Sequence, residues 1–197
     1  VPTIRRLIEA RCRIVICGGW LGRPHGVDPA LRMDPVAARL SELLNRPVQK
    51  LDDCVGPVVD QAVSRMQPGE IILLENTRFH PEEKANDPTF VQQLATLGEL
   101  CVFDAFAQAH RDHASTTGLV QVLPTVLGPL MVNELTALAQ ITTNPARPFV
   151  VVMGGAKITD KIAMLRRLVD QADHVVIGGA LANTFLKSSG AAVGASL

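Results

Sequence analysis

The chain has 197 residues, 47% of them hydrophobic, and its 19 basic residues balance 19 acidic ones, so its formal net charge at pH 7 is zero. Such a composition is typical of a globular protein with a sizeable core, and the lack of a global charge argues against nucleic-acid or membrane-surface partners. No apolar run approaches the roughly 20 residues that a membrane-spanning helix needs. The four cysteines lack metal-site spacing, which favours a reducing, cytoplasmic protein without a metal-thiolate site.

The first half of the chain alternates helical patterns with short, continuously apolar runs. The run 71–74, Ile-Ile-Leu-Leu, predicts a strand that is buried on both faces. Asp34-Pro35 predicts the start of a helix whose apolar face is formed by Val36, Leu40, Leu43 and Leu44. In chain order, the predicted elements are helix 1–8, strand 14–17, helix 34–44, strand 48–51, helix 58–66, strand 71–74, helix 88–97 and strand 100–103. This alternation predicts an α/β fold with doubly wound, Rossmann-like parallel sheets.

The second half begins with a longer amphipathic pattern, which predicts a helix over Pro129–Thr143, closed by the proline-containing segment 144–148. A second series follows, with strand 149–153, helix 160–172, strand 174–177 and helix 181–187. We therefore expect two domains, 1–128 and 148–197, joined by a long helix and linker over 129–147. Two βα units bury little apolar surface, and the chain neither begins with Met nor ends on a closing element, so we expect both domains to be incomplete.

Cationic side chains follow two of the predicted strands. Arg78 comes shortly after strand 71–74, and Arg111 follows strand 100–103 at a comparable offset. In open α/β sheets ligands bind beyond the carboxyl ends of the strands, where two guanidinium groups can converge on one phosphate or carboxylate. His80, His110 and His113 lie near these arginines in the sequence and would raise the local positive potential. The pattern predicts a site for a phosphorylated substrate; the alternative is a pair of surface salt bridges.

A glycine-rich turn follows the predicted strand 149–153. Gly154-Gly155-Ala156-Lys157 leads into Thr159-Asp160, where a helix is predicted to begin. Glycine lets the backbone approach a nucleotide closely, and a helix N-terminus with nearby lysines favours phosphate. The turn matches neither the G-x-G-x-x-G fingerprint nor the Walker A loop. The alternative is that the glycines serve only a left-handed turn between strand and helix.

Together, and in this order, the motifs closely resemble those of the phosphoglycerate kinases over nearly all of the chain. The matching blocks are Leu21-Gly22-Arg23-Pro24, the segment 74–81, Asp104-Ala105-Phe106, Ala109-His110-Arg111, the segment 113–116, Gly154-Gly155-Ala156-Lys157 with Asp160-Lys161-Ile162, and the segment 182–186. The resemblance implies a first domain that binds 3-phosphoglycerate on a basic patch. It implies a second domain that binds Mg2+ with ATP or ADP, and a long helix that joins the two.

The resemblance also implies roles for individual residues. Lys161 and Arg23 are implied to be catalytic. The implied substrate-binding positions are Arg23, Arg78, Arg111, His110 and Trp20, and the implied nucleotide-binding positions are Gly155, Ala156, Lys157, Asp160, Lys161, Gly178 and Gly179. The implied activity is glycolytic and reversible phosphoryl transfer between 1,3-bisphosphoglycerate and ADP. The intact protein is expected to be cytoplasmic and monomeric, with small-molecule substrates and no nucleic-acid or membrane partner.

Three positions depart from the family pattern. Gly19-Trp20 stands where the family has Ser-His, Ala107-Gln108 where it has Gly-Thr, and Ala180 where it has a third glycine. An indole donates one hydrogen bond but carries no charge. The family's opening substrate loop would lie before Val1 and its later nucleotide blocks beyond Leu197, so we expect these 197 residues alone to be inactive. The alternatives are a degenerate relative that only binds phosphorylated anions and, with little support because no G-x-G-x-x-G follows a strand, an unrelated nucleotide-binding enzyme such as a dehydrogenase.

Overall fold

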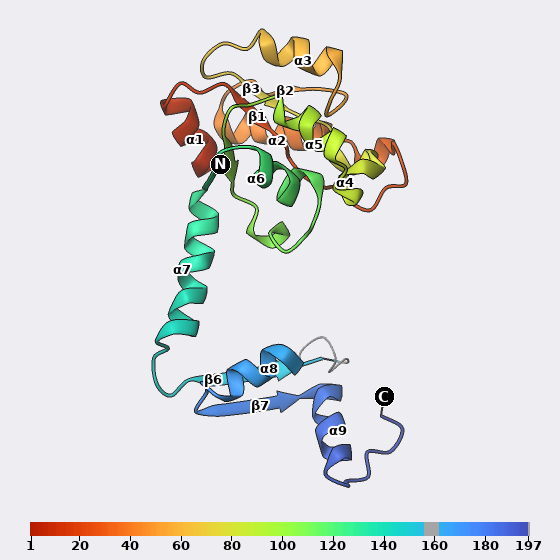
Figure 1. The fold of residues 1–197 in the computed structure, drawn as a ribbon, viewed down its shortest axis with the longest axis vertical. Helices are drawn as coiled ribbons and strands as arrows, with labels where there is room; N and C mark the ends of the chain where they lie inside the picture. Colours follow the sequence, from red (N-terminus) through yellow and green to blue (C-terminus); the bar gives the residue numbers. More distant parts are fainter. Residues whose placement is uncertain (156–161, 197) are drawn as a thin grey trace. The chain divides into compact units, whose positions relative to one another are not determined.

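The computed structural model describes residues 1–155 and 162–196, and the chain divides into two compact units, Val1–Leu135 and Thr136–Leu197. The helix predicted over Pro129–Thr143 is present with those bounds as α7 and runs across the division (Figure 1). Both units alternate strands with helices and contain parallel strand pairs. The predicted α/β fold with parallel sheets is therefore confirmed. Among the described residues, no helix combines the length and apolar character needed to cross a membrane.

The elements predicted for the first unit are present in the predicted order with small shifts in their bounds, and the structure adds two short helices and one strand that were not predicted. They are α1 (Pro2–Glu9), β1 (Ile14–Ile16), α2 (Asp34–Leu44), β2 (Gln49–Lys50), α3 (Pro57–Ser64), β3 (Ile71–Leu73), α4 (Pro81–Ala85), α5 (Pro88–Ala95), β4 (Cys101–Phe103), α6 (Leu119–Val122) and β5 (Thr125–Leu127). Short 3-10 turns occupy Pro29–Leu31, Thr77–Phe79 and Phe106–Gln108, and one π-helical turn occupies Ala114–Gly118.

The strands of the first unit form two parallel sheets. One has the order β1-β3-β2, and the other pairs β4 with β5. The central β3 is buried along its whole length, as its continuous apolar run predicts. The sequence did not predict β5, since Val126 and Leu127 are both about half exposed and the run is short and enclosed by Pro124 and Gly128. The strand β5 is therefore an addition to the predicted elements, and it pairs with β4 in a sheet separate from β1-β3-β2.

Helices cover both faces of the β1-β3-β2 sheet. Ile72 of β3 packs into a cluster with Val59 of α3 and Phe90 of α5. Ile71 packs instead with Leu44 of α2 and with apolar residues of α1. Because successive side chains of a strand point to opposite faces, these contacts place α3 and α5 on one face and α1 and α2 on the other. This is the doubly wound arrangement that the sequence predicts.

The buried face of α2 differs from the predicted one. Ala37 and Leu44 are buried, whereas Val36 and Leu43 are exposed by 38% and 41%. Ala37 lies in a cluster with Met33 and with Leu73 of β3. The small alanine side chain faces the sheet, so the core face runs through 33, 37, 40 and 44, and a prediction that weighted only large apolar residues rotated the helix incorrectly.

Asp104, directly after β4, fixes the start of α7. Its Oδ1 accepts hydrogen bonds from the backbone N–H groups of Leu130 at 2.8 Å and Met131 at 3.1 Å, and its Oδ2 accepts one from Thr3 Oγ1. These N–H groups belong to the first turn of a helix, which has no intrahelical partners for them. A Cβ atom at residue 128 would lie 2.3 Å from the Asp104 carboxyl group, so only glycine fits at this position.

The second unit contains one parallel strand pair and the helices beside it. β6 (Val150–Gly154) pairs with β7 (His174–Gly178), and the unit also contains α8 (Ile162–Val169) and α9 (Gly179–Ser188). Its described core is small and consists of Val151, Met153, Leu165 and Leu181, with partly buried apolar residues around them. Residues 156–161, which include the predicted start of the helix, lie outside the described part of the chain.

Candidate functional site

Three arginines come together at the carboxyl end of the β1-β3-β2 sheet. Arg78 lies on the turn that follows β3, and its Nη1 donates a hydrogen bond to the backbone oxygen of Gly22, beside Arg23, at 2.9 Å. The pKa of Arg78 is lowered from its usual value by burial and by the positive charges of Arg111 and Arg23. Like charges that act on one another in this way create a positive potential that favours an anion.

Trp20 contacts two members of this region through its indole ring. The Arg78 Cζ atom lies 4.3 Å from the ring centroid, within the range of a cation–π contact. The His113 ring lies 4.5 Å from the Trp20 ring, with the planes tilted by 49°. The indole Nε1 donates a hydrogen bond to Glu83 Oε1 at 2.7 Å. Trp20 therefore links the loop after β1 to the arginine site and to α4.

Glu83 is a fully buried carboxylate that sequence reasoning missed. Besides the Trp20 indole, it accepts hydrogen bonds from the Ser115 backbone N–H at 3.1 Å and from Ser115 Oγ at 2.5 Å. The segment Pro81-Glu82-Glu83-Lys84 has the composition of a solvated, charged helix start. Nothing in it distinguishes the buried Glu83 from its exposed neighbour Glu82.

Two buried side-chain nitrogen atoms near Trp20 form no hydrogen bond within the described part of the chain. Arg78 Nε and His113 Nδ1 are inaccessible to solvent and have no hydrogen-bond partner among the described residues. A buried donor without a partner is costly, roughly 1–3 kcal/mol for each group. The arrangement is thus suited to an oxyanion that accepts a hydrogen bond from Arg78.

We expect the stability of the first unit to fall as the pH decreases below 7, because of His113. Burial lowers the pKa of His113 from its usual 6.5; the negative charge of Glu83 opposes this effect, the positive charges of Arg78, Arg111 and Lys84 add to it, and the net change is a lowering. The unfolded chain therefore binds a proton at a higher pH than the folded chain, so unfolding takes up a proton and the free energy of unfolding decreases as the pH falls through 6.5.

Urea unfolding followed by circular dichroism between about pH 7.5 and pH 5.5 measures this loss. A His113→Gln chain should lose less stability over the same range, while His25→Gln, in an exposed loop, should behave like the unchanged chain. Equal pH dependence in His113→Gln and in the unchanged chain would contradict the prediction.

Of the remaining predicted residues in this region, Arg23, His110 and Arg111 are exposed. His80 differs from the expectation that it adds to the positive potential. Its Nε2 lies 2.7 Å from Asp53 Oδ1, and its ring stacks on Phe90 with the centroids 5.0 Å apart. The carboxylate of Asp53 balances any charge that His80 carries.

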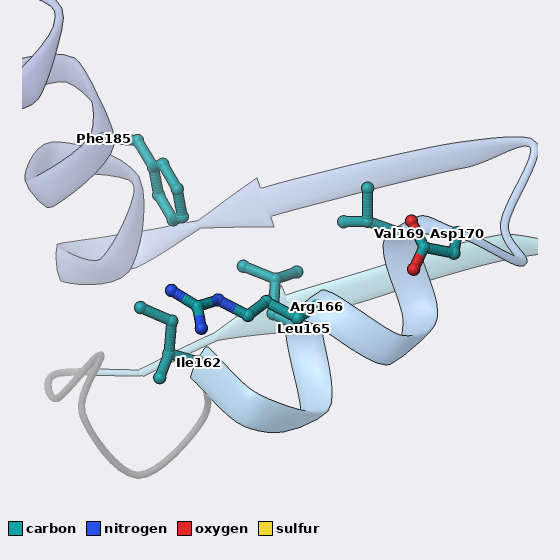
Figure 2. A pocket seen from close by; sticks show the side chains of 6 residues that line it. All are labelled: Ile162, Leu165, Arg166, Val169, Asp170 and Phe185. Atoms are coloured by element: carbon teal, nitrogen blue, oxygen red, sulfur yellow. The ribbon is translucent and has the colours of Figure 1, made fainter.

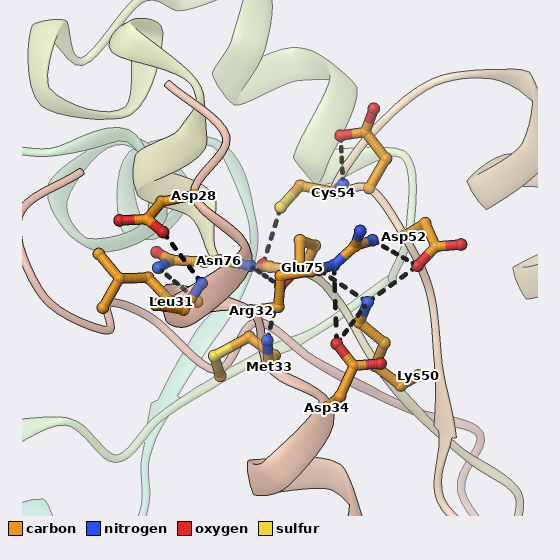
Figure 3. Close-up of polar contacts among 12 residues, drawn as sticks. Asp28, Leu31, Arg32, Met33, Asp34, Lys50, Asp52, Cys54, Glu75 and Asn76 are labelled. Atoms are coloured by element: carbon orange, nitrogen blue, oxygen red, sulfur yellow. Dashed lines mark hydrogen bonds and ion pairs between the residues drawn. The ribbon is translucent and has the colours of Figure 1, made fainter. Parts of the chain in front are cut away.

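A network around Glu75 holds the loop that contains Arg23 (Figure 3). Glu75, which is 2% exposed, accepts hydrogen bonds from Lys50 Nζ at 2.7 Å, Arg32 Nε at 3.1 Å and the backbone N–H of Met33 at 2.8 Å. Burial alone would raise the pKa of Glu75, but the hydrogen bonds from Lys50 and from the Asn76 and Met33 backbone outweigh it and hold this pKa below its usual value. Glu75 is therefore a buried anion whose oxygens are well supplied with donors.

Asn76 continues this network into the loop itself. Its Nδ2 donates hydrogen bonds to the backbone oxygens of Leu21 at 2.8 Å and Leu31 at 3.0 Å, and its Oδ1 accepts one from the Arg78 backbone N–H at 3.1 Å. One buried amide side chain thus fixes both ends of the loop 21–31 and the turn that carries Arg78. The sequence shows Asn76 only as part of a motif, without indicating this role.

Two thiols near the site, those of the partly buried Cys17 and the buried Cys54, are held in their protonated form. Burial raises the pKa of Cys17 to about 12, with a further contribution from the negative charge of Glu83. Burial also raises the pKa of Cys54 far above its usual value, and the Cys54 thiol donates to the Glu75 backbone oxygen. Asp53, Cys54 and His80 each place one potential ligand atom within 4.8 Å of the others. A protonated thiol is a poor metal ligand, so we assign no metal to this group.

The second unit brings two glycine turns together. Gly154 and Gly178 are paired at the carboxyl ends of β6 and β7. Gly155 and Gly179 follow these strands with positive φ angles of 138° and 64°, a conformation that favours glycine. A Cβ atom on Gly179 would lie 3.9 Å from the Gly155 backbone nitrogen, so the two turns are adjacent. The geometry fits a ligand that approaches the backbone closely.

The sequence pattern that defines the phosphoglycerate kinase family matches this chain over residues 1–197. The chain belongs to the phosphoglycerate kinase family. Its relatives include the phosphoglycerate kinases of Moorella thermoacetica, 50% identical over 198 residues, and Pelotomaculum thermopropionicum, 52% identical over 198 residues. Each comparison covers 100% of this chain and 50% of the relative. The chain thus spans about half the length of the curated relatives it matches.

Solved structures give the same assignment. The phosphoglycerate kinase structure from Coxiella burnetii has a TM-score of 0.83 at 37% identity, covering 100% of this chain and 49% of that chain. The structure from Pyrococcus horikoshii OT3 has a TM-score of 0.81 at 34% identity, covering 98% of this chain and 50% of that chain. The resemblance inferred from the sequence motifs is confirmed.

Four positions that the family resemblance assigns to the nucleotide site lie outside the described residues: Ala156, Lys157, Asp160 and Lys161. The second unit also has an open hollow of about 500 Å³, which Figure 2 shows lined by Phe185 of α9 and by residues of α8 with the following Asp170. Its lining is Ile162, Leu165, Arg166, Val169, Asp170 and Phe185. Within the described part of the chain, none of the predicted site residues lines it, and we assign it no role in the chemistry.

Proposed function

We propose that this chain is part of a glycolytic phosphotransferase that moves a phosphoryl group reversibly between 1,3-bisphosphoglycerate and ADP, giving 3-phosphoglycerate and ATP. The observation that carries the proposal is that Arg78, on the turn beyond the carboxyl end of β3, is hydrogen-bonded to Gly22 beside Arg23 and lies within the electrostatic influence of both Arg23 and Arg111. Phosphoryl transfer needs little covalent help from the protein and depends on positioning and charge neutralisation. A cluster of guanidinium groups suits both requirements.

In this proposal the region 1–128 binds phosphoglycerate, 129–147 joins the two domains, and 148–197 begins the nucleotide domain. Arg23, Arg78, Arg111 and His110 bind the substrate, with Trp20 in the same site. Lys161 and Arg23 are the catalytic cations. ATP or ADP is bound by residues of two glycine turns and the start of a helix: Gly155, Ala156, Lys157, Asp160, Lys161, Gly178 and Gly179. The protein acts as a cytoplasmic monomer on small molecules.

The described part of the proposed nucleotide site fits such a ligand. Gly155 and Gly179 carry no Cβ where the two turns meet, and α9 begins at Gly179 with backbone N–H groups that can face a phosphate. Mg2+ would accompany the nucleotide, because this ion is usually held largely by substrate phosphates and water. When bound, it would neutralise negative charge on the phosphate oxygens.

A second candidate is a relative that binds phosphorylated anions without transferring phosphate. Trp20 favours it, because the indole occupies the arginine site as a neutral group and its only hydrogen-bond donor is used by Glu83. Both candidates have the anion site. They differ in whether the protein transfers a phosphoryl group and, therefore, in whether Lys161 contributes to the rate of that transfer.

A chimeric protein separates the two candidates. Residues 1–197 of this chain would replace the matching half of the Moorella thermoacetica phosphoglycerate kinase, and ATP formation from 1,3-bisphosphoglycerate and ADP would be measured. We expect phosphoryl transfer, and a decrease of about 100-fold for Lys161→Ala, because one preorganised charge commonly contributes that much to a transfer rate. The 197 residues alone are expected to show no transfer.

Lys187→Ala, which changes another lysine of the same unit, is the matched control and should keep the rate. A folded chimera that binds 3-phosphoglycerate in calorimetry but forms no ATP would support the anion-binding candidate instead. A chimera whose rate is the same with and without Lys161 would contradict the catalytic role of that residue.

A further inference from the structure

The indole of Trp20 makes three directed contacts and belongs to no hydrophobic core cluster described for the chain. Its ring face contacts the Arg78 guanidinium at 4.3 Å and the His113 ring at 4.5 Å, and its Nε1 donates to Glu83 at 2.7 Å. The side chain is only partly buried. Such a set of contacts restrains the indole in position and in orientation.

The contact with Arg78 has a geometric consequence for ligand binding. A guanidinium group that lies over an aromatic ring keeps its N–H groups available around its edge, where hydrogen bonds to an oxyanion form. One edge group, Nη1, is used by the Gly22 backbone oxygen, while the buried Nε is without a partner among the described residues. The ring therefore limits the orientations of Arg78 while leaving donors for a ligand.

Glu83 fixes the indole of Trp20 through the hydrogen bond that it accepts from Nε1. Its carboxylate is fully buried and is itself held by two hydrogen bonds from Ser115, so it cannot shift easily. The chain of contacts Ser115–Glu83–Trp20–Arg78 connects the Ala114–Gly118 turn to the arginine. A phenylalanine at residue 20 would keep the ring face but lose this anchor, and a leucine would lose both.

We propose that Trp20 is a positioning residue that holds the Arg78 guanidinium in the orientation that binds the substrate phosphate or carboxylate. The inference rests on the proposed function for the identity of the substrate. It does not require Trp20 to touch the substrate, because Trp20 acts through Arg78. Its contribution should therefore vanish when Arg78 is absent.

A double-mutant cycle tests this dependence. Calorimetry with 3-phosphoglycerate, and in parallel with inorganic phosphate, would measure the dissociation constants of the unchanged chain, Trp20→Leu, Trp20→Phe, Arg78→Ala and the two combined chains Trp20→Leu/Arg78→Ala and Trp20→Phe/Arg78→Ala. We expect Trp20→Leu to weaken binding about tenfold and Trp20→Phe about two- to threefold, in line with cation–π contacts of this kind. In the Arg78→Ala background the same changes should have no effect. Circular dichroism would establish that each chain is folded, and Trp20→Phe decides the question if Trp20→Leu does not fold.

The outcomes separate the inference from the proposed function. Binding of 3-phosphoglycerate with an equal effect of Trp20→Leu in both backgrounds would overturn the positioning role and leave the function standing. Binding of phosphate but not of 3-phosphoglycerate, with the coupling present, would overturn the function and support the positioning role. No heat with either anion would overturn both.

The composition provides an independent readout. Trp20 is the single tryptophan of the chain, and there is no tyrosine, so the intrinsic fluorescence reports on this residue. We expect saturation with 3-phosphoglycerate or phosphate to change the Trp20 emission in the unchanged chain and not in Arg78→Ala. A tryptophan that served only packing would show no such dependence on Arg78, and an identical response in both chains would contradict the inference.

Discussion

Replacing Glu75 by leucine is expected to lower the free energy of unfolding of the first unit by about 3–5 kcal/mol, the range for removing one partner of a buried ion pair. The substitution leaves the side chain of Lys50, which is 9% exposed, with only the exposed carboxylates of Asp34 and Asp52. It also removes the acceptor of the Met33 and Asn76 backbone N–H groups. Each of these buried donors would then lack its hydrogen bond.

Urea unfolding followed by Trp20 fluorescence measures this loss, because Trp20 lies in the first unit. Glu42→Leu is the matched control. Glu42 is an exposed carboxylate that pairs with Arg39 on the surface of α2, and such pairs contribute little. Similar unfolding curves for Glu75→Leu and Glu42→Leu would contradict the structural role of the buried network.

Replacing Arg78 by alanine is expected to weaken 3-phosphoglycerate binding by about 10- to 150-fold, since a hydrogen bond to a charged group is worth about 1.5–3 kcal/mol. Arg78→Lys should recover only part of the affinity. A lysine keeps the charge, but it lacks the planar group that lies over Trp20 and that can form two parallel hydrogen bonds.

Calorimetry at constant ionic strength measures both effects, and Arg39→Ala serves as the control. Arg39 is exposed on α2 and pairs with Glu42, so its loss changes the net charge equally without touching the arginine site. If Arg39→Ala weakened binding as much as Arg78→Ala, the affinity would come from overall charge rather than from a built site, and the proposed substrate contact would be wrong.

Much of the fold could be predicted from the sequence, because apolar runs such as that of β3 are long enough to identify a strand. The failures have physical causes. β5 escaped prediction because its apolar run is only Val126-Leu127 and both residues are about half exposed, so its pairing with β4 rather than its composition makes it a strand. The face of α2 was misplaced because Ala37, a weakly hydrophobic residue, fits the space against the sheet better than Val36.

The candidate site was predictable in part. The sequence singled out Arg78 and Arg111, because charged residues after buried strands are informative about ligands, and their binding of a ligand stays a prediction. Glu83 and Lys50 were not found, because a buried charge and a solvated one have the same letters in a sequence, and only the partners in three dimensions distinguish them. The sequence singled out Trp20 as a departure, but its contacts with Arg78 and Glu83 required the structure.

The loop 21–31 is held from outside through its backbone oxygens, and this has an evolutionary consequence. Asn76 donates to the carbonyl groups of Leu21 and Leu31, which every amino acid possesses. Exposed positions of the loop such as Val27 can therefore change without loosening it, whereas Gly22, with its positive φ angle, and Asp28, which accepts a hydrogen bond from the Ala30 backbone N–H, are restrained by their own structural roles. The position of Asn76 has no such freedom, because aspartate lacks the amide donor and glutamine is one methylene longer.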